Sequence, residues 1–292
     1  MEKALEIKHL TKTYGKVKGV SDISLTVEQG DFYGFIGPNG AGKSTTIRSM
    51  LGLIKKDSGI INLLGMDIER NKVEILKRVG YMPSETMFYP RMHVQEIIKM
   101  SAAAYQMDCS NTAGELCERL KVDTRKRIEE LSLGNRKKIS IVCALQHKPD
   151  LYIFDEPTSG LDPLMQKEFF ALLAQVNKEG ATIFFSSHVL SEIQNYCNNA
   201  AIIKDGKLIA VDSVSNLTKT NARKVKIGGM KEVPNIPGIT GLNLEEDIVS
   251  FLYRGKIKEL ISALDKLQVA DLIIEEPSLE EIFLHYYERE AK

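Results

Sequence analysis

A phosphate-binding loop is the strongest chemical signal in the sequence, because one run of residues fits the pattern G-x-x-x-x-G-K-[ST]. The run consists of Gly37, Pro38, Asn39, Gly40, Ala41, Gly42, Lys43, Ser44 and Thr45. Its glycines let successive amide N–H groups point inward, and together with the positive end of the helix that follows they form an anion-binding site. We expect Lys43 to reach the β- and γ-phosphates and Ser44 to ligate Mg²⁺. A glycine-rich turn before an ordinary helix is the competing interpretation, but the complete pattern after an apolar strand favours a nucleoside triphosphate.

Two carboxylates end the apolar segment 151–156, which is predicted to be a strand. Asp155 suits direct or indirect coordination of Mg²⁺ opposite Ser44. Glu156 is oriented differently, and it could orient or deprotonate an attacking water. Two acids that end a buried strand are costly unless a cation or a solvent cleft receives them, so a merely solvated strand end is the weaker interpretation.

Three further residues could contact a nucleotide. His188 follows the predicted strand 181–187, where an imidazole can donate a hydrogen bond to a terminal phosphate. Ser132 and Gly134 precede a predicted helix over 136–146 and could form a second anion-binding surface, although only together with a partner; a plain serine N-cap is the simpler alternative. Tyr14 could stack on a base, and from the residue alone a half-buried tyrosine at a strand end is the better interpretation.

The elements that must position these residues predict an α/β fold. Alternating patterns over 4–10 and 23–27 indicate an antiparallel β-subdomain ahead of the phosphate loop. Helical patterns over 94–105 and 111–120, with no strand between them, indicate an inserted helical subdomain at about 86–147. The predicted fold is therefore a phosphate-loop NTPase core, residues 1–217, with these two subdomains.

Residues 218–292 are predicted to form a small α/β accessory domain. Short strands are expected at 224–227, 239–242, 248–253 and 270–275, and helices at 256–267 and 278–290. No catalytic constellation occurs in this region, and no ligand is inferred for it.

Composition excludes several classes of protein. Lys plus Arg equals Asp plus Glu at 39 each, so no net charge favours nucleic acid or anionic lipid. Cys109, Cys117, Cys143 and Cys197 have no metal-binding spacing and are expected to be reduced thiols. The N-terminus lacks the apolar core of a signal peptide, and no segment has the roughly 18–20 apolar residues that span a bilayer. We expect a soluble, cytoplasmic protein that reaches the membrane through a partner.

Five motifs in fixed order resemble those of the ATP-binding cassette (ABC) ATPases of transporters, over about residues 5–217. Residues 37–45 resemble the Walker A motif, 151–156 the Walker B motif, and 131–135 the LSGGQ signature. Residues 159–162 resemble the D-loop, and His188 the switch histidine. Tyr14 falls where the family has its adenine-stacking aromatic residue, which reverses the interpretation given above.

The chain departs from the family pattern at two motifs. Leu133 replaces the first signature glycine, and Asn135 replaces the usual glutamine. The glutamine of the Q-loop would fall at Ser84, which Glu85 follows, so either residue could take over its contact with Mg²⁺.

The resemblance implies a mechanism and partners. Two cassettes, identical or different, would enclose ATP and Mg²⁺ between the phosphate loop of one subunit and Ser132 and Gly134 of the other. Lys43 would stabilise charge, Glu156 would act as base and His188 would hold the γ-phosphate. A separate transmembrane permease would be driven from the inner face of the membrane. The tail at 277–284 is similar to exporter-type cassettes for drug, peptide or lipid-like substrates.

Two other classes of phosphate-loop protein fit the sequence less well. A soluble ABC-type ATPase of translation or DNA repair would carry two cassettes or long coiled coils, whereas this chain has one cassette and no sustained heptads. A GTPase switch would need an N-K-x-D motif, and neither 71–74 nor 177–180 carries the aspartate.

Overall fold

The computed structural model describes residues 2–15, 17–218, 222–229, 237–245, 247–265, 267 and 269–275. The chain divides into two compact units, Met1–Asp212 and Ser213–Lys292. The division falls just before α8, whereas the sequence pattern predicts a boundary after residue 217. Within the described residues, no helix is both long enough and apolar enough to cross a membrane.

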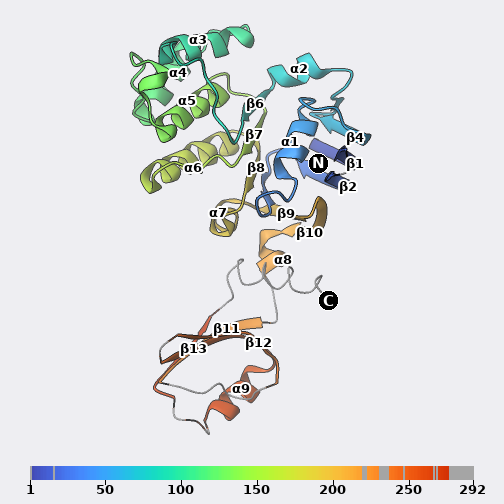
Figure 1. Ribbon diagram of the computed structural model, residues 1–292, viewed down its shortest axis with the longest axis vertical. Coiled ribbons are helices and arrows are strands. Elements are labelled where there is room, and N and C mark those ends of the chain that lie inside the picture. The colour runs from blue at the N-terminus through green and yellow to red at the C-terminus, as the bar shows by residue number, and fades with distance from the viewer. Residues whose placement is uncertain are drawn as a thin grey trace. The chain divides into compact units, whose positions relative to one another are not determined.

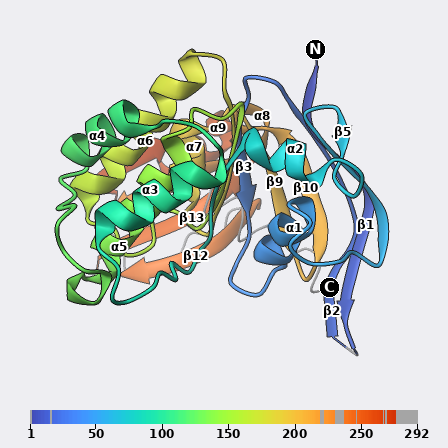
Figure 2. The same cartoon turned by 90° about the horizontal axis from the view of Figure 1, so that it is seen from above.

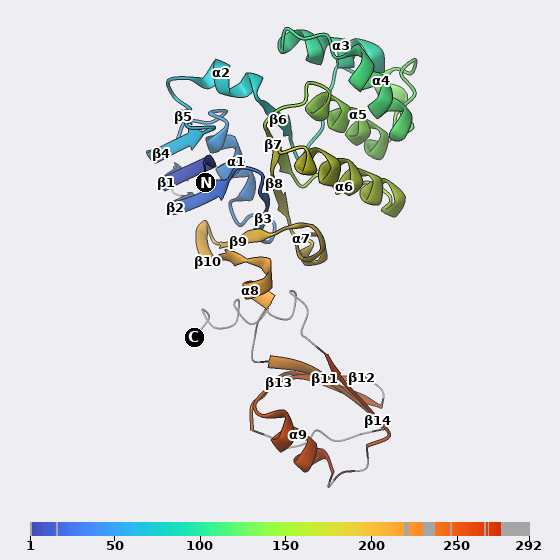
Figure 3. The same ribbon diagram turned by 180° about the vertical axis from the view of Figure 1, so that it is seen from behind.

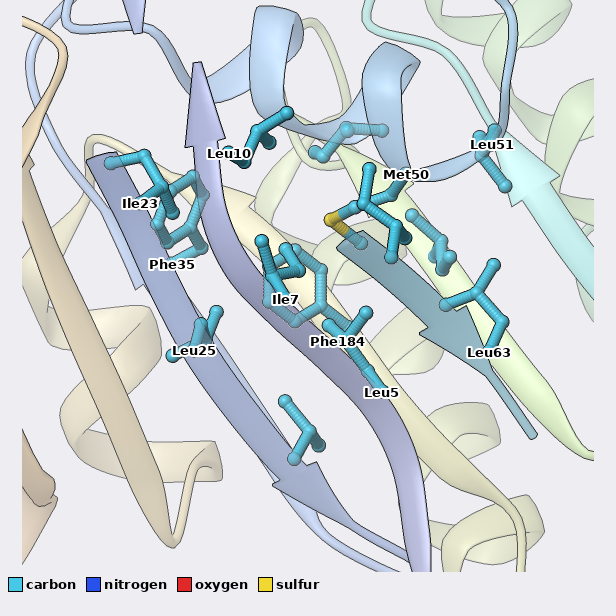
Figure 4. Packing of buried hydrophobic residues seen from close by; sticks show 14 of the residues in the cluster. Leu5, Ile7, Leu10, Ile23, Leu25, Phe35, Met50, Leu51, Leu63 and Phe184 are labelled. Carbon is cyan, nitrogen blue, oxygen red and sulfur yellow. The ribbon is translucent and has the colours of Figure 1, made fainter. Parts of the chain in front are cut away.

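An antiparallel sheet with strand order β2-β1-β4-β5 forms one side of the first unit. Its strands are β1 (Lys3–Tyr14), β2 (Val17–Glu28), β4 (Ser58–Leu63) and β5 (Met66–Asp67). Leu5, Ile7 and Leu10 are buried, and they pack with Met50 and Phe184 in one hydrophobic cluster (Figure 4). The alternation of apolar residues therefore predicts the buried face correctly, although both long strands extend beyond the predicted segments.

A second sheet, with strand order β10-β9-β3-β8-β7-β6, carries the candidate site. Its strands are β3 (Phe32–Ile36), β6 (Val79–Met82), β7 (Leu151–Asp155), β8 (Thr182–Ser187), β9 (Asn199–Lys204) and β10 (Lys207–Ser213). The strands β3, β7 and β8 are buried along their whole length, as expected for parallel strands covered on both faces.

The register of this sheet brings the ends of its strands to one edge. Ile36 at the end of β3 pairs with Ser187 at the end of β8, and Asp155 pairs with Ser186 on the other side. Because the carboxyl ends of parallel strands share an edge, the loops after β3, β7 and β8 emerge together. These loops contain the phosphate loop, Glu156 and His188, so this arrangement confirms the predicted α/β core.

Helices cover the second sheet. They are α1 (Lys43–Met50), α2 (Lys72–Lys77), α3 (Val94–Ala104), α4 (Ser110–Arg119), the 3₁₀ turn η1 (Ile128–Glu130), α5 (Leu133–Leu145), α6 (Pro163–Lys178) and α7 (Leu190–Tyr196). Helices α3, α4 and α5 gather on the side of the unit away from the antiparallel sheet (Figures 1 and 2). This group corresponds to the inserted helical subdomain expected from the sequence.

The start of α5 differs from the prediction. The helix begins at Leu133, three positions before the predicted start at Arg136. Ser132 is extended and acts as N-cap, since its hydroxyl accepts a hydrogen bond from the Asn135 N–H at 3.4 Å. The Leu-Gly pair after Ser132 resembles a loop in sequence, but the cap compensates for the low helix propensity of Gly134.

The second unit contains an antiparallel sheet with strand order β12-β13-β11-β14 and one described helix that packs on it (Figure 3). Its elements are β11 (Ala222–Gly228), β12 (Ile239–Glu245), β13 (Ile248–Arg254), α9 (Ile257–Leu264) and β14 (Asp271–Glu275), after the short α8 (Val214–Thr218). Leu260 and Leu264 of α9 pack on Val225 and Phe251. The predicted helix 278–290 and the exporter-like tail 277–284 lie outside the described residues.

Candidate functional site

The phosphate loop needs glycine at two positions for different reasons. Gly42, the residue before α1, has φ 105°, a conformation that side chains disfavour. Gly37 has an ordinary φ, but a Cβ there would lie 2.5 Å from the Ile203 carbonyl oxygen of β9. The loop is therefore held closely against the sheet, and its N–H groups precede the N-terminus of α1.

Lys43 is the first residue of α1, and its side chain is only 5% exposed. The Nζ atom donates to the carbonyl oxygens of Gly37 at 2.6 Å and Pro38 at 3.0 Å. It also lies 3.0 Å from Glu156 Oε1. Lys43 thus bridges the phosphate loop and the end of β7, where it can stabilise negative charge.

Glu156 lies at the centre of the site. Its φ of 51° is in the left-handed region that non-glycine residues rarely adopt, and such strained residues often occur at functional sites. Its carboxylate lies between Lys43 and His188, with Oε2 2.6 Å from His188 Nδ1. The sequence predicts Lys43, Glu156 and His188 as catalytic residues, and Glu156 contacts both of the others.

Asp155 is completely buried beside Glu156. Its Oδ1 accepts a hydrogen bond from the Ser186 hydroxyl at 2.7 Å, and that hydroxyl also accepts from the Glu156 N–H at 3.1 Å. Its Oδ2 is buried and has no hydrogen-bond partner within the described part of the chain. An unpartnered buried carboxylate oxygen is costly, and it fits a cation or a water bound to one. Ser44, half-buried in the first turn of α1, supplies a second hard oxygen.

Ser84 and Glu85 follow β6, the neighbour of β7. Met82 at the end of β6 pairs with Phe154, one residue before Asp155. Ser84 is half-buried, whereas Glu85 is exposed. Both residues are therefore close in register to the acidic pair, but within the described residues no hydrogen bond or ion pair joins either one to Asp155.

Tyr14 lies beside the phosphate-loop helix. A Cβ placed on Gly19 would be 2.9 Å from the Tyr14 ring and 3.2 Å from the Thr45 side chain, so Gly19 leaves room for both. The ring is 49% exposed, and Lys12 Nζ is 5.4 Å from its centre. An exposed aromatic ring next to Thr45 suits stacking on a base. A tyrosine that served only to pack against the strand would be more buried than this one.

Ser132 and Gly134 are at the start of α5, in a different part of the unit. Within the described residues, no hydrogen bond or ion pair joins either residue to the phosphate loop. A Cβ on Gly134 would lie 2.7 Å from the Gly160 carbonyl oxygen, so this helix start packs closely on the loop before α6. Leu133, between them, is exposed. Ser132 is also exposed, so the start of α5 is open to solvent.

Two residues that support this site, Ser186 and Lys137, are not predicted from the sequence. Lys137 is 2% exposed, and its Nζ donates to the Glu156 carbonyl oxygen at 2.7 Å. Burial lowers the pKa of its ammonium group, and the negative charges of Glu156, Asp155 and Glu192 oppose this shift. The sequence does carry one indication that Lys137 is buried. It lies on the same helical face as the apolar residues Ile141 and Ala144.

The site combines the N–H donors of the phosphate loop, the buried Lys43 ammonium group, an unpartnered oxygen of Asp155 and the Glu156 carboxylate. Such a set can bind a triphosphate, orient a water in line with the terminal phosphorus and stabilise the charge that develops on phosphoryl transfer.

Comparison with known proteins adds independent information. Residues 20–159 match the family model described as ABC transporter. The chain is 41% identical over 226 residues to the bacitracin transport ATP-binding protein BcrA of Bacillus licheniformis, over 76% of this chain and 74% of that one. It is 30% identical over 302 residues to the linearmycin resistance ATP-binding protein LnrL of Bacillus subtilis (strain 168), over 96% and 97% of the two chains.

A solved structure of the ATP-binding subunit of an ABC transporter superposes with a TM-score of 0.70 at 28% identity. The match covers 74% of this chain and 92% of that one. The relative LnrL, in contrast, aligns over nearly the whole length, so its similarity includes the region of the second unit.

Proposed function

Because this chain belongs to the family of ABC transporter ATP-binding subunits, we propose that it hydrolyses ATP at the Lys43–Glu156–His188 cluster to drive export through a separate permease. The observation that carries this proposal is the Glu156 carboxylate held between Lys43 and His188 at the edge where the phosphate loop begins. The proposed cargo is an antimicrobial peptide or a similar drug-like compound, since one relative is named for bacitracin transport and another for linearmycin resistance.

Each site residue has a proposed role. The N–H groups of residues 37–45 and the Lys43 ammonium bind the phosphates, and Tyr14 stacks on the adenine. Glu156 accepts a proton from the attacking water, while His188 holds the γ-phosphate. Mg²⁺, held by the Ser44 hydroxyl and the free Oδ2 of Asp155, would neutralise charge on the phosphate oxygens.

A second cassette completes the site in this proposal. The N-terminus of α5, with Ser132 and Gly134, offers N–H groups that do not contact the chain's own phosphate loop. The exposed Leu133 beside them adds apolar area that another subunit would bury. The ATPase would therefore be active as a dimer on the inner face of the membrane, where the permease holds two cassettes together.

An apolar groove is the proposed contact with the permease. It has a volume of about 360 Å³, and its lining includes Leu51, Leu53, Val73, Leu76, Tyr81 and Tyr105. Leu53 and Val73 are exposed although both are large and apolar. A short cytoplasmic segment of the permease could bury this groove, since the membrane protein must contact the cassette that drives it.

The export proposal is tested with a tagged chain purified from detergent-solubilised membranes. The expected result is co-purification of one membrane protein, and vesicles containing both should accumulate bacitracin when ATP is supplied. Vesicles with Glu156→Gln should not accumulate it. Co-purification with ribosomes, and with no membrane protein, would instead favour a soluble ABC-type ATPase.

A further inference from the structure

A buried cation contacts the main chain of the proposed general base. Lys137 is on α5, and its ammonium group donates to the carbonyl oxygen of Glu156 at 2.7 Å. Lysine is almost never buried as completely as this one unless its charge is compensated. The neighbouring negative charges of Asp155, Glu156 and Glu192 provide that compensation. The nearest hydrogen-bond acceptor is nevertheless a peptide carbonyl, which fixes the backbone rather than a side chain.

The position of that carbonyl matters because the Glu156 backbone is strained. A residue with φ 51° costs free energy unless surrounding contacts hold it. The Glu156 N–H donates to two oxygens of Ser186. These are the hydroxyl oxygen at 3.1 Å and the carbonyl oxygen at 3.2 Å. Lys137 holds the carbonyl oxygen of the same residue. These contacts, one at each end of the residue, fix the direction in which the Glu156 side chain leaves the backbone.

We propose that Lys137 is a positioning residue, whose hydrogen bond to the Glu156 carbonyl aims the Glu156 carboxylate for attack by water. This inference rests on the proposed role of Glu156 as general base. Lys137 does not touch the phosphates or the water in this assignment, and it acts only through Glu156.

The location of Lys137 on α5 gives the contact a second consequence. Ser132 and Gly134 lie at the N-terminus of the same helix, about 7.5 Å and about 4.5 Å from Lys137 along the axis. A shift of α5 when its N-terminus engages the ATP held by a second subunit would move Lys137, and with it the Glu156 carbonyl. The base of one site would thus respond to the nucleotide of the other.

The test compares steady-state ATP hydrolysis by Lys137→Met and Lys137→Gln. Methionine keeps the size of the side chain and removes every N–H donor, whereas glutamine keeps a donor without the charge. The expected result is a kcat at least tenfold lower for Lys137→Met, with a KM for ATP within twofold of wild type. Lys137→Gln should retain more than a third of the wild-type kcat. Lys138→Met, the same change at the next position of α5, is the matched control and should stay within twofold of wild type.

A wild-type kcat for Lys137→Met would overturn the proposal, and so would a Lys137→Gln variant as slow as Lys137→Met. If Lys137→Met does not fold, Lys137→Ala takes its place under the same criteria. Glu156→Gln is measured in the same assay. If Glu156→Gln turns over ATP normally, the proposed function is wrong; if it is inactive while Lys137→Met is normal, only the role of Lys137 is wrong.

A second measurement separates positioning from general damage. In the Glu156→Gln background, Lys137→Met should lower the residual rate by less than twofold, because a residue that acts through the Glu156 carboxylate has nothing left to position. A further tenfold loss in that background would show an independent role and overturn the proposal.

Discussion

Lys43 Nζ lies 3.0 Å from Glu156 Oε1, and protein encloses both side chains almost completely. Two carbonyl oxygens of the phosphate loop contact the same ammonium group. Phosphate oxygens that bind Lys43 must therefore compete with these carbonyl oxygens for its N–H donors and with the Glu156 carboxylate for its positive charge. The ion pair also places Glu156, the proposed base, in direct contact with Lys43, the residue that should bind the β- and γ-phosphates.

Glu156→Gln should remove turnover and preserve nucleotide binding. Glutamine has nearly the same shape but cannot accept a proton from water, so we expect kcat to fall by about 10²- to 10⁴-fold. ATP should bind at least as tightly as to wild type, because the amide competes less strongly for Lys43 than the carboxylate does. Phosphate release and equilibrium dialysis measure the two quantities. Glu115→Gln, on the exposed face of α4, is the control, and a Glu156→Gln variant with normal turnover would refute the assigned role.

Tyr14→Ala should weaken ATP binding. Stacking of a base on an aromatic ring contributes about 1–3 kcal/mol, which corresponds to roughly 5- to 150-fold in Kd. Tyr14→Phe keeps the stacking face and should bind ATP nearly as wild type does. Tyr89→Ala removes another exposed tyrosine, in the loop before α3, and serves as the control in the same titration. If Tyr14→Ala leaves the affinity unchanged, the residue is an ordinary strand-end tyrosine.

Ser84 is expected to contribute more to metal binding than Glu85. Ser84 is half-buried two residues after β6, the strand that pairs with β7, whereas Glu85 is exposed. Ser84→Ala should therefore raise by several-fold the Mg²⁺ concentration that gives half-maximal ATP hydrolysis. Glu85→Ala should leave that concentration unchanged. The reverse pattern would assign the replacement of the Q-loop glutamine to Glu85.

The proximity of the proposed catalytic residues is predictable from sequence because it follows from topology. Apolar runs that end in Glu156 and His188 indicate parallel strands, and parallel strands deliver their ends to one edge. The turn at Asp205 and Gly206, between β9 and β10, has a local cause, since both residues have the positive φ that a tight hairpin requires.

The supporting contacts were not predictable, because each joins segments distant in sequence. The hydrogen bond from Lys137 to Glu156 depends on how α5 packs against the end of β7. The close approach of Gly134 to Gly160 depends on the same packing. Patterns of polarity and helix or strand propensity describe one element at a time. They show which residues could form such contacts, but not which residue of another element each one contacts.

Gly134→Ala should damage activity through that close approach. The added Cβ would lie 2.7 Å from the Gly160 carbonyl oxygen, which is backbone and cannot swing away, so the start of α5 must shift. We expect ATP hydrolysis to fall at least tenfold, while ATP binding to the chain's own phosphate loop changes little. Gly114→Ala is the control, because nothing lies within 4 Å of a Cβ there. In α4 this change should stabilise the protein by about 0.5–1 kcal/mol. Normal hydrolysis by Gly134→Ala would contradict the tight packing.

His147 should make stability depend on pH below neutrality. Its ring is 4% exposed and stacks on Tyr105 at 3.6 Å, and Nε2 is 3.3 Å from the Val79 carbonyl oxygen. Burial lowers the pKa of His147 to about 4. Between the unfolded value of 6.5 and 4, the unfolded chain takes up a proton that the folded chain does not. The contribution of neutral His147 is therefore fully present above pH 6.5 and is lost as pH falls toward 4.

His147→Phe removes this titration and keeps an aromatic ring to stack on Tyr105. Between pH 7 and pH 5, wild type should lose about 2 kcal/mol of unfolding free energy more than His147→Phe, since each pKa unit corresponds to about 1.36 kcal/mol. Urea unfolding of both proteins at the two pH values measures this difference. The comparison cancels the carboxylates common to both proteins and any constant cost of losing the bond to Val79. Parallel pH profiles for the two proteins would mean that His147 can be protonated without leaving its buried position.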